Sequence, residues 1–155
     1  MKKVIMLLII ILPMIACSEE TDCCVNADIS LDITYLNADG LNLFEIEQGY
    51  NASDITVYHK INGEWEVYYK SNLDAPKGIT VVDGAHGTYL SLSPSTTLDQ
   101  NKQSETKIQF SASDSDIIKT EIDQSHSNTS ITKVWYNDVL VWETHDAKSM
   151  IEIIK

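Results

Sequence analysis

An Asn-Gly pair between two runs of alternating apolar residues is the feature that most restricts the fold of this chain. Apolar and polar residues alternate over 55–61, Asn62-Gly63 follows, and the alternation resumes over 65–69. Because Asn and Gly both tolerate a positive φ, such a pair is the strongest local signal for a tight β-hairpin. Alternation with a period of two predicts strands with one face on a core. The sequence therefore predicts an antiparallel hairpin here.

The same alternation predicts strands along almost all of the chain after residue 25. We expect them at 29–35, 79–83, 88–93, 105–111, 117–123, 131–136, 139–143 and 149–154. Asn137-Asp138 joins two of these runs and predicts a second hairpin. No apolar pattern with helical spacing extends over ten residues. Many short strands with frequent turns predict an all-β fold, a single antiparallel β-sandwich of immunoglobulin-like or transthyretin-like type.

The segments between these strands are predicted to be turns and loops. Asn37 to Gly40 and residues 125–129 have the composition of turns. The polar stretch 94–104 is expected to be an exposed loop. Residues 41–53 lack alternation, and we expect Leu43, Phe44 and Ile46 to lie under the sheet edge.

The first seventeen residues have the layout of a secretory signal. Lys2 and Lys3 precede an apolar run of about a dozen residues, which is shorter than the roughly 20 that a membrane-spanning helix needs. Met14-Ile15-Ala16-Cys17 resembles the bacterial lipobox, in which the cysteine is acylated and becomes the mature N-terminus. The resemblance implies a cleaved signal peptide at 1–16, a lipidated tether at 17–24 and a β-sandwich domain at 25–155.

Two further stretches resemble those of small surface lipoproteins of Bacteroidota. Cys17-Ser18-Glu19-Glu20 places acids directly behind the lipidated cysteine, as their export signal does, and residues 133–142 are similar to their C-terminal ending. That group has no established activity, so the resemblance implies a place and a fold. We expect a lipid-anchored protein of the outer membrane that faces outward from the cell.

The charge of the chain excludes several partners. The formal charge is −12, and removing Lys2 and Lys3 with the signal leaves nine lysines against 23 acids, a charge of −14. Such a balance repels nucleic acid and anionic lipid headgroups. The chain contains no arginine, the residue that most often clamps phosphates. We therefore expect no nucleic-acid partner and no phosphate-handling enzyme.

The cysteines do not form a disulfide framework. Besides Cys17 the chain has only the adjacent Cys23 and Cys24. A bridge between neighbours is geometrically disfavoured. Free thiols, a link to another chain and further acylation remain open for this pair.

No catalytic motif stands out, and we expect no enzyme. The four histidines lack zinc spacing, and His59 falls on the apolar side of its strand. A Gly-x-Ser-x-Gly elbow is missing. Glu64 and Glu66 flank Trp65 and form the best local carboxylate pair. Asp39, Asp114 and Asp116 resemble parts of calcium loops, in which alternate oxygen ligands meet a hard cation. Calcium is accordingly the one cofactor that we consider, beside the expectation of none.

The aromatic residues of the two hairpins are the most suggestive set. The candidates for ligand binding are Trp65, Tyr69, Trp135, Tyr136 and Trp142. Exposed aromatic rows on β-sandwiches stack on sugar rings in many carbohydrate-binding modules, whereas core packing is the alternative use of such residues. We expect a binding or structural role with a glycan or an envelope protein as partner. The alternatives are an accessory of an extracellular polysaccharide hydrolase and a periplasmic envelope assembly factor.

Overall fold

The computed structural model describes residues 26–124, 128–144, 146 and 150–155. The predicted signal peptide, Cys17 and the Cys23–Cys24 pair lie outside these ranges, as does most of the turn expected at 125–129. Within the described ranges there is no helix long and apolar enough to cross a membrane.

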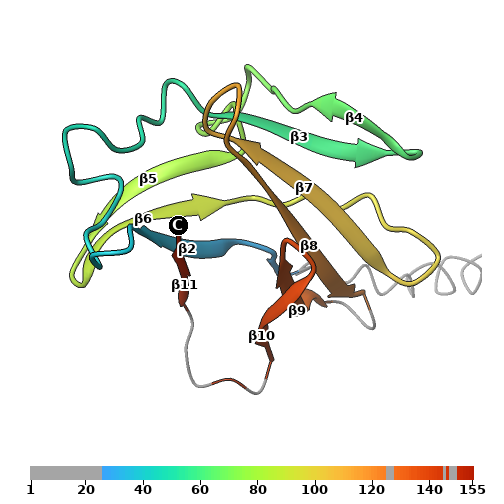
Figure 1. Ribbon diagram of the computed structural model, residues 1–155. Helices are drawn as coiled ribbons and strands as arrows, with labels where there is room; N and C mark the ends of the chain where they lie inside the picture. The colour runs from blue at the N-terminus through green and yellow to red at the C-terminus, as the bar shows by residue number, and fades with distance from the viewer. Residues whose placement is uncertain (1–25, 125–127, 145, 147–149) are drawn as a thin grey trace, which may run out of the picture.

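The described chain forms two sheets that pack face to face, which confirms the predicted all-β sandwich (Figure 1). Sheet A has the order β1-β9-β8-β7-β3-β4, and β10 pairs with β9 beside β1. Its strands are β1 (Asn26–Asp28), β3 (Thr56–Ile61), β4 (Glu64–Val67), β7 (Gln103–Gln109), β8 (Ser115–Asp123), β9 (Asn128–Tyr136) and β10 (Val139–Glu143).

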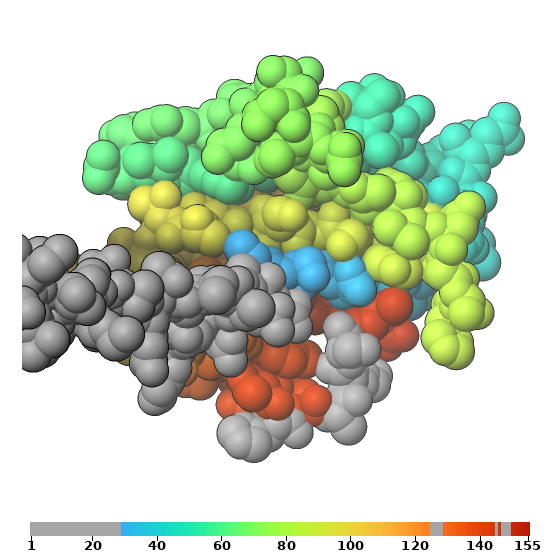
Figure 2. Space-filling view, turned by 180° about the vertical axis from the view of Figure 1, so that it is seen from behind, coloured from blue at the N-terminus to red at the C-terminus, as the bar shows by residue number. Residues whose placement is uncertain are grey.

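Sheet B has the order β11-β2-β6-β5. It consists of β2 (Leu31–Leu36), β5 (Ile79–Gly84), β6 (Gly87–Leu92) and β11 (Met150–Ile154). Most neighbouring strands are antiparallel, but β1 runs parallel to β9 and β11 runs parallel to β2. Seen from behind, the red residues of β11 lie against the blue residues of β2 (Figure 2).

Alternating side chains from both sheets form one core. In β2 the buried residues are Leu31, Ile33 and Tyr35, and their neighbours are partly exposed. Sheet A contributes Val57, Ile108, Ile118, Ile122 and Val134, each at most 1% exposed. Burial of about ten such side chains supplies the main driving force for folding, at about 25 cal/mol per Å² of apolar surface.

Both predicted hairpins are confirmed. Asn62 and Gly63 have φ values of 52° and 91°, and β3 and β4 pair directly across them. Asn137 and Asp138 have φ values of 45° and 69° between β9 and β10. Two consecutive positive φ angles match the right-handed twist of the flanking strands.

The irregular stretch before β3 packs as expected, with one addition. Leu43 and Phe44 contact the core, as does Tyr50, whose ring stacks on Phe110 with centroids 4.0 Å apart. All three expected residues are partly buried, but Ile46, unlike Leu43 and Phe44, is not among those packed against the core.

The expectation of an exposed loop at 94–104 is wrong at both ends of that stretch. Ser95 and Ser104 are buried, with exposures of 0% and 2%. The Ser95 N–H donates to Thr106 Oγ1 over 2.7 Å, and the Ser104 hydroxyl donates to the Ser95 carbonyl over 2.5 Å. Ser104 Oγ also lies 2.8 Å from Thr120 Oγ1. These polar residues enter the interior because they satisfy one another.

Candidate functional site

Two of the three hairpin tryptophans, Trp65 and Trp135, lie on the outer face of sheet A and face solvent. Val57, Thr106, Thr120 and Val134 point into the core, so the residues that alternate with them point outward. Trp65 lies opposite Lys60 on β3, and Trp135 lies opposite Lys119 on β8. Each of these four residues is partly exposed.

Strand register places these residues in one line across five strands. Glu105 on β7 lies opposite Lys119, and its carboxylate holds Lys60 Nζ at 3.0 and 3.1 Å. We call this line the tryptophan row, and it consists of Trp65, Lys60, Glu105, Lys119 and Trp135. Because neighbouring strands are about 4.8 Å apart, the two tryptophans lie about 19 Å apart along the sheet. That distance corresponds to several sugar units of an extended polysaccharide.

A second line of residues lies beside the tryptophan row. Tyr58 on β3 lies opposite Val67 on β4 and Lys107 on β7, and Lys107 lies opposite Ile117 on β8. Val67 is 61% exposed. Lys107 Nζ lies 4.1 Å from the ring centroid of Tyr58 and 5.3 Å from that of Trp65. The outer face of sheet A is therefore a mixed surface of aromatic rings and ammonium groups.

Ion pairs fix most of the lysines on this face. Besides Lys60–Glu105, Lys119 pairs with Asp138 at 2.8 Å, and Lys133 pairs with Glu121 at 3.3 Å. The hydrogen bond and charge of Lys119 lower the pKa of the Asp138 carboxyl. Four of the eight lysines in the described part of the chain, Lys60, Lys107, Lys119 and Lys133, point outward from sheet A.

The other predicted aromatic residues are not in the tryptophan row. Tyr69 follows β4 and is 62% exposed beside the loop that leads to β5. Tyr136 points inward, packs on the core and donates its hydroxyl to Asp116 over 2.8 Å. Burial and that hydrogen bond raise the pKa of Tyr136 well above its ordinary value. The structure thus separates Trp135 and Tyr136 onto opposite faces, as their adjacency predicts.

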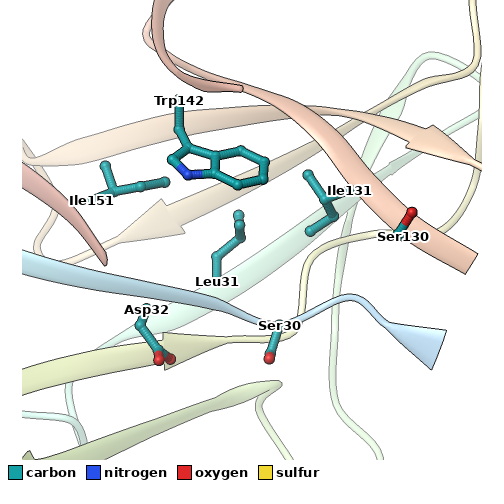
Figure 3. Close-up of a pocket in the computed structure, with 7 residues that line it drawn as sticks. All are labelled: Ser30, Leu31, Asp32, Ser130, Ile131, Trp142 and Ile151. Atoms are coloured by element: carbon teal, nitrogen blue, oxygen red, sulfur yellow. The ribbon is translucent and has the colours of Figure 1, made fainter. Parts of the chain in front are cut away.

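Trp142 lies between the sheets at one side of a pocket of about 290 Å³ (Figure 3). Leu31 points from β2 towards the indole, and Ile131 and Ile151 flank it, whereas Ser30 and Asp32 point to the other side of β2. The indole therefore covers apolar side chains at this margin of the core. Trp142 shares neither a face nor a row with Trp65 and Trp135.

Asp114 and Asp116 bind the ammonium of Lys155. Lys155 Nζ lies 2.5 Å from Asp114 Oδ1 and 2.9 Å from Asp116 Oδ2. Tyr50 donates its hydroxyl to Asp114 over 2.6 Å. Burial would raise the pKa of Asp114, but the hydrogen bonds from Lys155 and Tyr50 outweigh it, so the pKa lies below its usual value. The two carboxylates that were candidates for calcium thus face a cation supplied by the chain.

Asp39 lies in the turn that follows β2. Its backbone N–H donates to Asn37 Oδ1 over 3.0 Å. Within the described ranges no three His, Cys, Asp or Glu side chains come together as a metal site. The calcium site stays a prediction. Two of its three proposed ligands, Asp114 and Asp116, bind the ammonium of Lys155.

His59 and the Glu64–Glu66 pair lie at the margin of sheet A. His59 stacks on Tyr68 with centroids 4.2 Å apart, and its Nε2 is buried without a hydrogen bond. Burial and the charge of Lys70 lower its pKa to about 4. Glu64 and Glu66 are exposed on β4, at the free edge of the sheet.

Sequence reasoning identified Trp65 and Trp135 but missed Tyr58 and the lysines beside them. The alternation of inward and outward residues in the sequence could have identified these lysines. Lys60, Lys107 and Lys119 all alternate with core residues of their strands, so the alternation that defines the core also places them on one outer face.

Comparisons with protein-family models, with curated proteins and with solved structures found no match to this chain.

Proposed function

We propose that this protein is a lipid-anchored, non-enzymatic glycan-binding module that holds an extended polysaccharide on the outer face of sheet A. The observation that carries the proposal is the strand register that puts Trp65 and Trp135 in one row, with their side chains on the same face. Aromatic rings on a flat sheet offer apolar faces to the C–H groups of sugar rings. Hydrogen-bonding groups for sugar hydroxyls lie between the two rings.

Ion pairs along the row support a binding role. Glu105 and Lys60 hold each other between β3 and β7, and Lys119 is held by Asp138. Side chains that are already ordered lose less conformational entropy when a ligand binds. The Lys60–Glu105 pair is therefore already positioned between the two tryptophans.

The location is part of the same proposal. Acylation of Cys17 would tether the domain to the outer membrane through residues 17–24, and the acids behind the cysteine favour exposure to the outside. A module on a short lipidated tether would retain polysaccharide at the cell surface. Digestion of intact cells with a protease separates this position from a periplasmic one, because a surface domain is degraded.

Affinity electrophoresis tests the binding. The full-length protein in detergent is run through gels that contain xylan, mixed-linkage glucan, mannan or hyaluronan. We expect one of these to retard the protein, and Trp65→Ala or Trp135→Ala to weaken the interaction about tenfold, the loss that a central aromatic contact causes.

Tyr89→Ala is the matched control. Tyr89 is a partly exposed aromatic residue on β6, on the outer face of sheet B. Its removal should leave the retardation unchanged. Retardation that survives the Trp65→Ala/Trp135→Ala double substitution would refute the proposed surface.

A further inference from the structure

Two ammonium groups converge on one tryptophan at the β4 end of the tryptophan row. Lys60 Nζ lies 5.5 Å from the Trp65 ring centroid, and Lys107 Nζ lies 5.3 Å from it on the neighbouring line of residues. Lys107 is closer still to Tyr58, at 4.1 Å. A cation over an aromatic ring is held by the negative face of that ring. Both ammonium groups therefore lie over the Trp65 ring.

The ammonium groups of Lys60 and Lys107 have different partners. Lys60 has both oxygens of Glu105 within 3.1 Å. Lys107 has ring contacts, and in the described part of the chain no carboxylate lies within 4.0 Å of its ammonium. An aromatic face accepts no strong hydrogen bond from an ammonium, which has three N–H donors. Lys107 therefore has donors to offer to an anion.

This arrangement discriminates between neutral and acidic sugars. A neutral sugar that stacks on Tyr58 must displace the Lys107 ammonium from the ring. A sugar that carries a carboxylate also has to move this ammonium from the ring, but it can accept charge-assisted hydrogen bonds from it in return. The subsite is thus suited to a uronic acid.

The acidity of the whole chain limits how many charges the ligand can carry. At physiological salt the Debye length is about 8 Å, so exposed acids that lie farther than this from the subsite through solvent are largely screened. Glu105 and Glu121 nevertheless lie on the same outer face. A ligand with a carboxylate on every sugar would be repelled by these two glutamates. A ligand whose carboxylates are separated by neutral sugars can place a neutral sugar beside each glutamate.

We propose that Lys107, Trp65 and Tyr58 form a subsite for the carboxylate of a uronic acid. The ligand is then a polysaccharide whose acidic sugars are separated by neutral ones. The inference rests on the proposed glycan-binding function and names its substrate class.

Calorimetric titration of the full-length protein in detergent tests it with matched ligands. Oligosaccharides of hyaluronan and of glucuronoxylan are compared with the same oligosaccharides after chemical reduction of their carboxyl groups to neutral alcohols. We expect the wild type to bind an acidic form at least about tenfold more tightly than its reduced form. Lys107→Met, which keeps the aliphatic stem, should abolish this preference, so that the acidic and the reduced form bind equally.

Lys133→Met is the control, because Lys133 is an outward lysine already paired with Glu121, away from Trp65. It should keep the preference for the acidic form. Equal binding of acidic and reduced forms by the wild type, with Lys107→Met unchanged, would overturn the subsite and leave the glycan-binding function standing. Failure of the folded protein to bind any saccharide would overturn both.

Discussion

Lys155 Nζ lies 2.9 Å from the carboxylate of Asp116, whose side chain is only 3% exposed. Lys155 directly follows β11 in sheet B, and Asp116 is in β8 of sheet A, so this ion pair connects the two sheets. The rings of Phe110 and Tyr50 surround the same ammonium, with centroids at 4.6 and 5.6 Å. The last residue of the chain is thereby fixed against the opposite sheet.

Lys155→Met should lower the free energy of unfolding by about 3 kcal/mol, because it leaves the buried Asp116 carboxylate without its cation. Denaturant unfolding measures the effect. Adding Asp116→Asn to this variant should recover part of the loss, because the unpaired charge is then gone. Lys119→Met breaks an exposed pair with Asp138 and should cost less than about 1 kcal/mol. Equal effects of the two lysine substitutions would contradict a structural role for the Lys155 pair.

His59 should make stability depend on pH in the mildly acidic range. Its pKa is lowered to about 4 in the folded chain, mainly by burial, against an ordinary value of 6.5. Between these values the unfolded state binds more protons, so this contribution is complete above pH 6.5 and is lost as the pH falls towards 4. Denaturation midpoints at pH 7 and pH 5 should therefore differ less in His59→Gln than in the wild type. An unchanged difference would show that other groups cause it.

Alanine substitutions at Gly63 and Gly49 should destabilise the fold by different amounts, because the first causes only backbone strain and the second causes a steric clash. A Cβ on Gly63 would meet no atom within 4 Å, so Gly63→Ala should cost only the strain of φ +91°, about 1 kcal/mol. A Cβ on Gly49 would lie 1.8 Å from the carbonyl oxygen of Leu43, so Gly49→Ala must displace the backbone. Thermal unfolding should show a much larger loss for Gly49→Ala. A ranking in the opposite order would refute the conformation of residues 43–49.

Cys17→Ala should release the protein from the membrane fraction, because the proposed anchor consists of acyl chains on that sulfur. Labelling of cells with radioactive palmitate, followed by fractionation, measures both acylation and attachment. Cys23→Ala is the matched control and should remain attached. Attachment of Cys17→Ala at the wild-type level would refute the lipobox.

The hairpins of this fold could be predicted because their signals are local. Asn62-Gly63 and Asn137-Asp138 tolerate positive φ, and the alternation beside them indicates the strands. The alternation also gives the inward position of Ile108 and the outward position of Lys107. The link between Lys155 and Asp116 could not be predicted in this way, because it depends on how two distant strands pack.

The position of Trp142 shows where alternation fails. Leu140 pairs with the outward Trp135, and strict alternation would place Trp142 on the same face as Leu140. The register shifts between these two residues, and Trp142 instead pairs with the buried Val134. One extra residue in a strand reverses the faces of all that follow, and the sequence around Val141 carries no turn residue to indicate it.

Tryptophan fluorescence with a bound polysaccharide tests the central claim most directly. The polysaccharide that retards the protein is titrated into three forms of the full-length chain: the wild type, Trp142→Phe and Trp65→Phe/Trp135→Phe. The account predicts a change in emission, and protection from acrylamide, that persists in Trp142→Phe and disappears in Trp65→Phe/Trp135→Phe. A response that persists without Trp65 and Trp135 and disappears without Trp142 would contradict it, and would place the ligand at the margin of the core instead of on the outer face of sheet A.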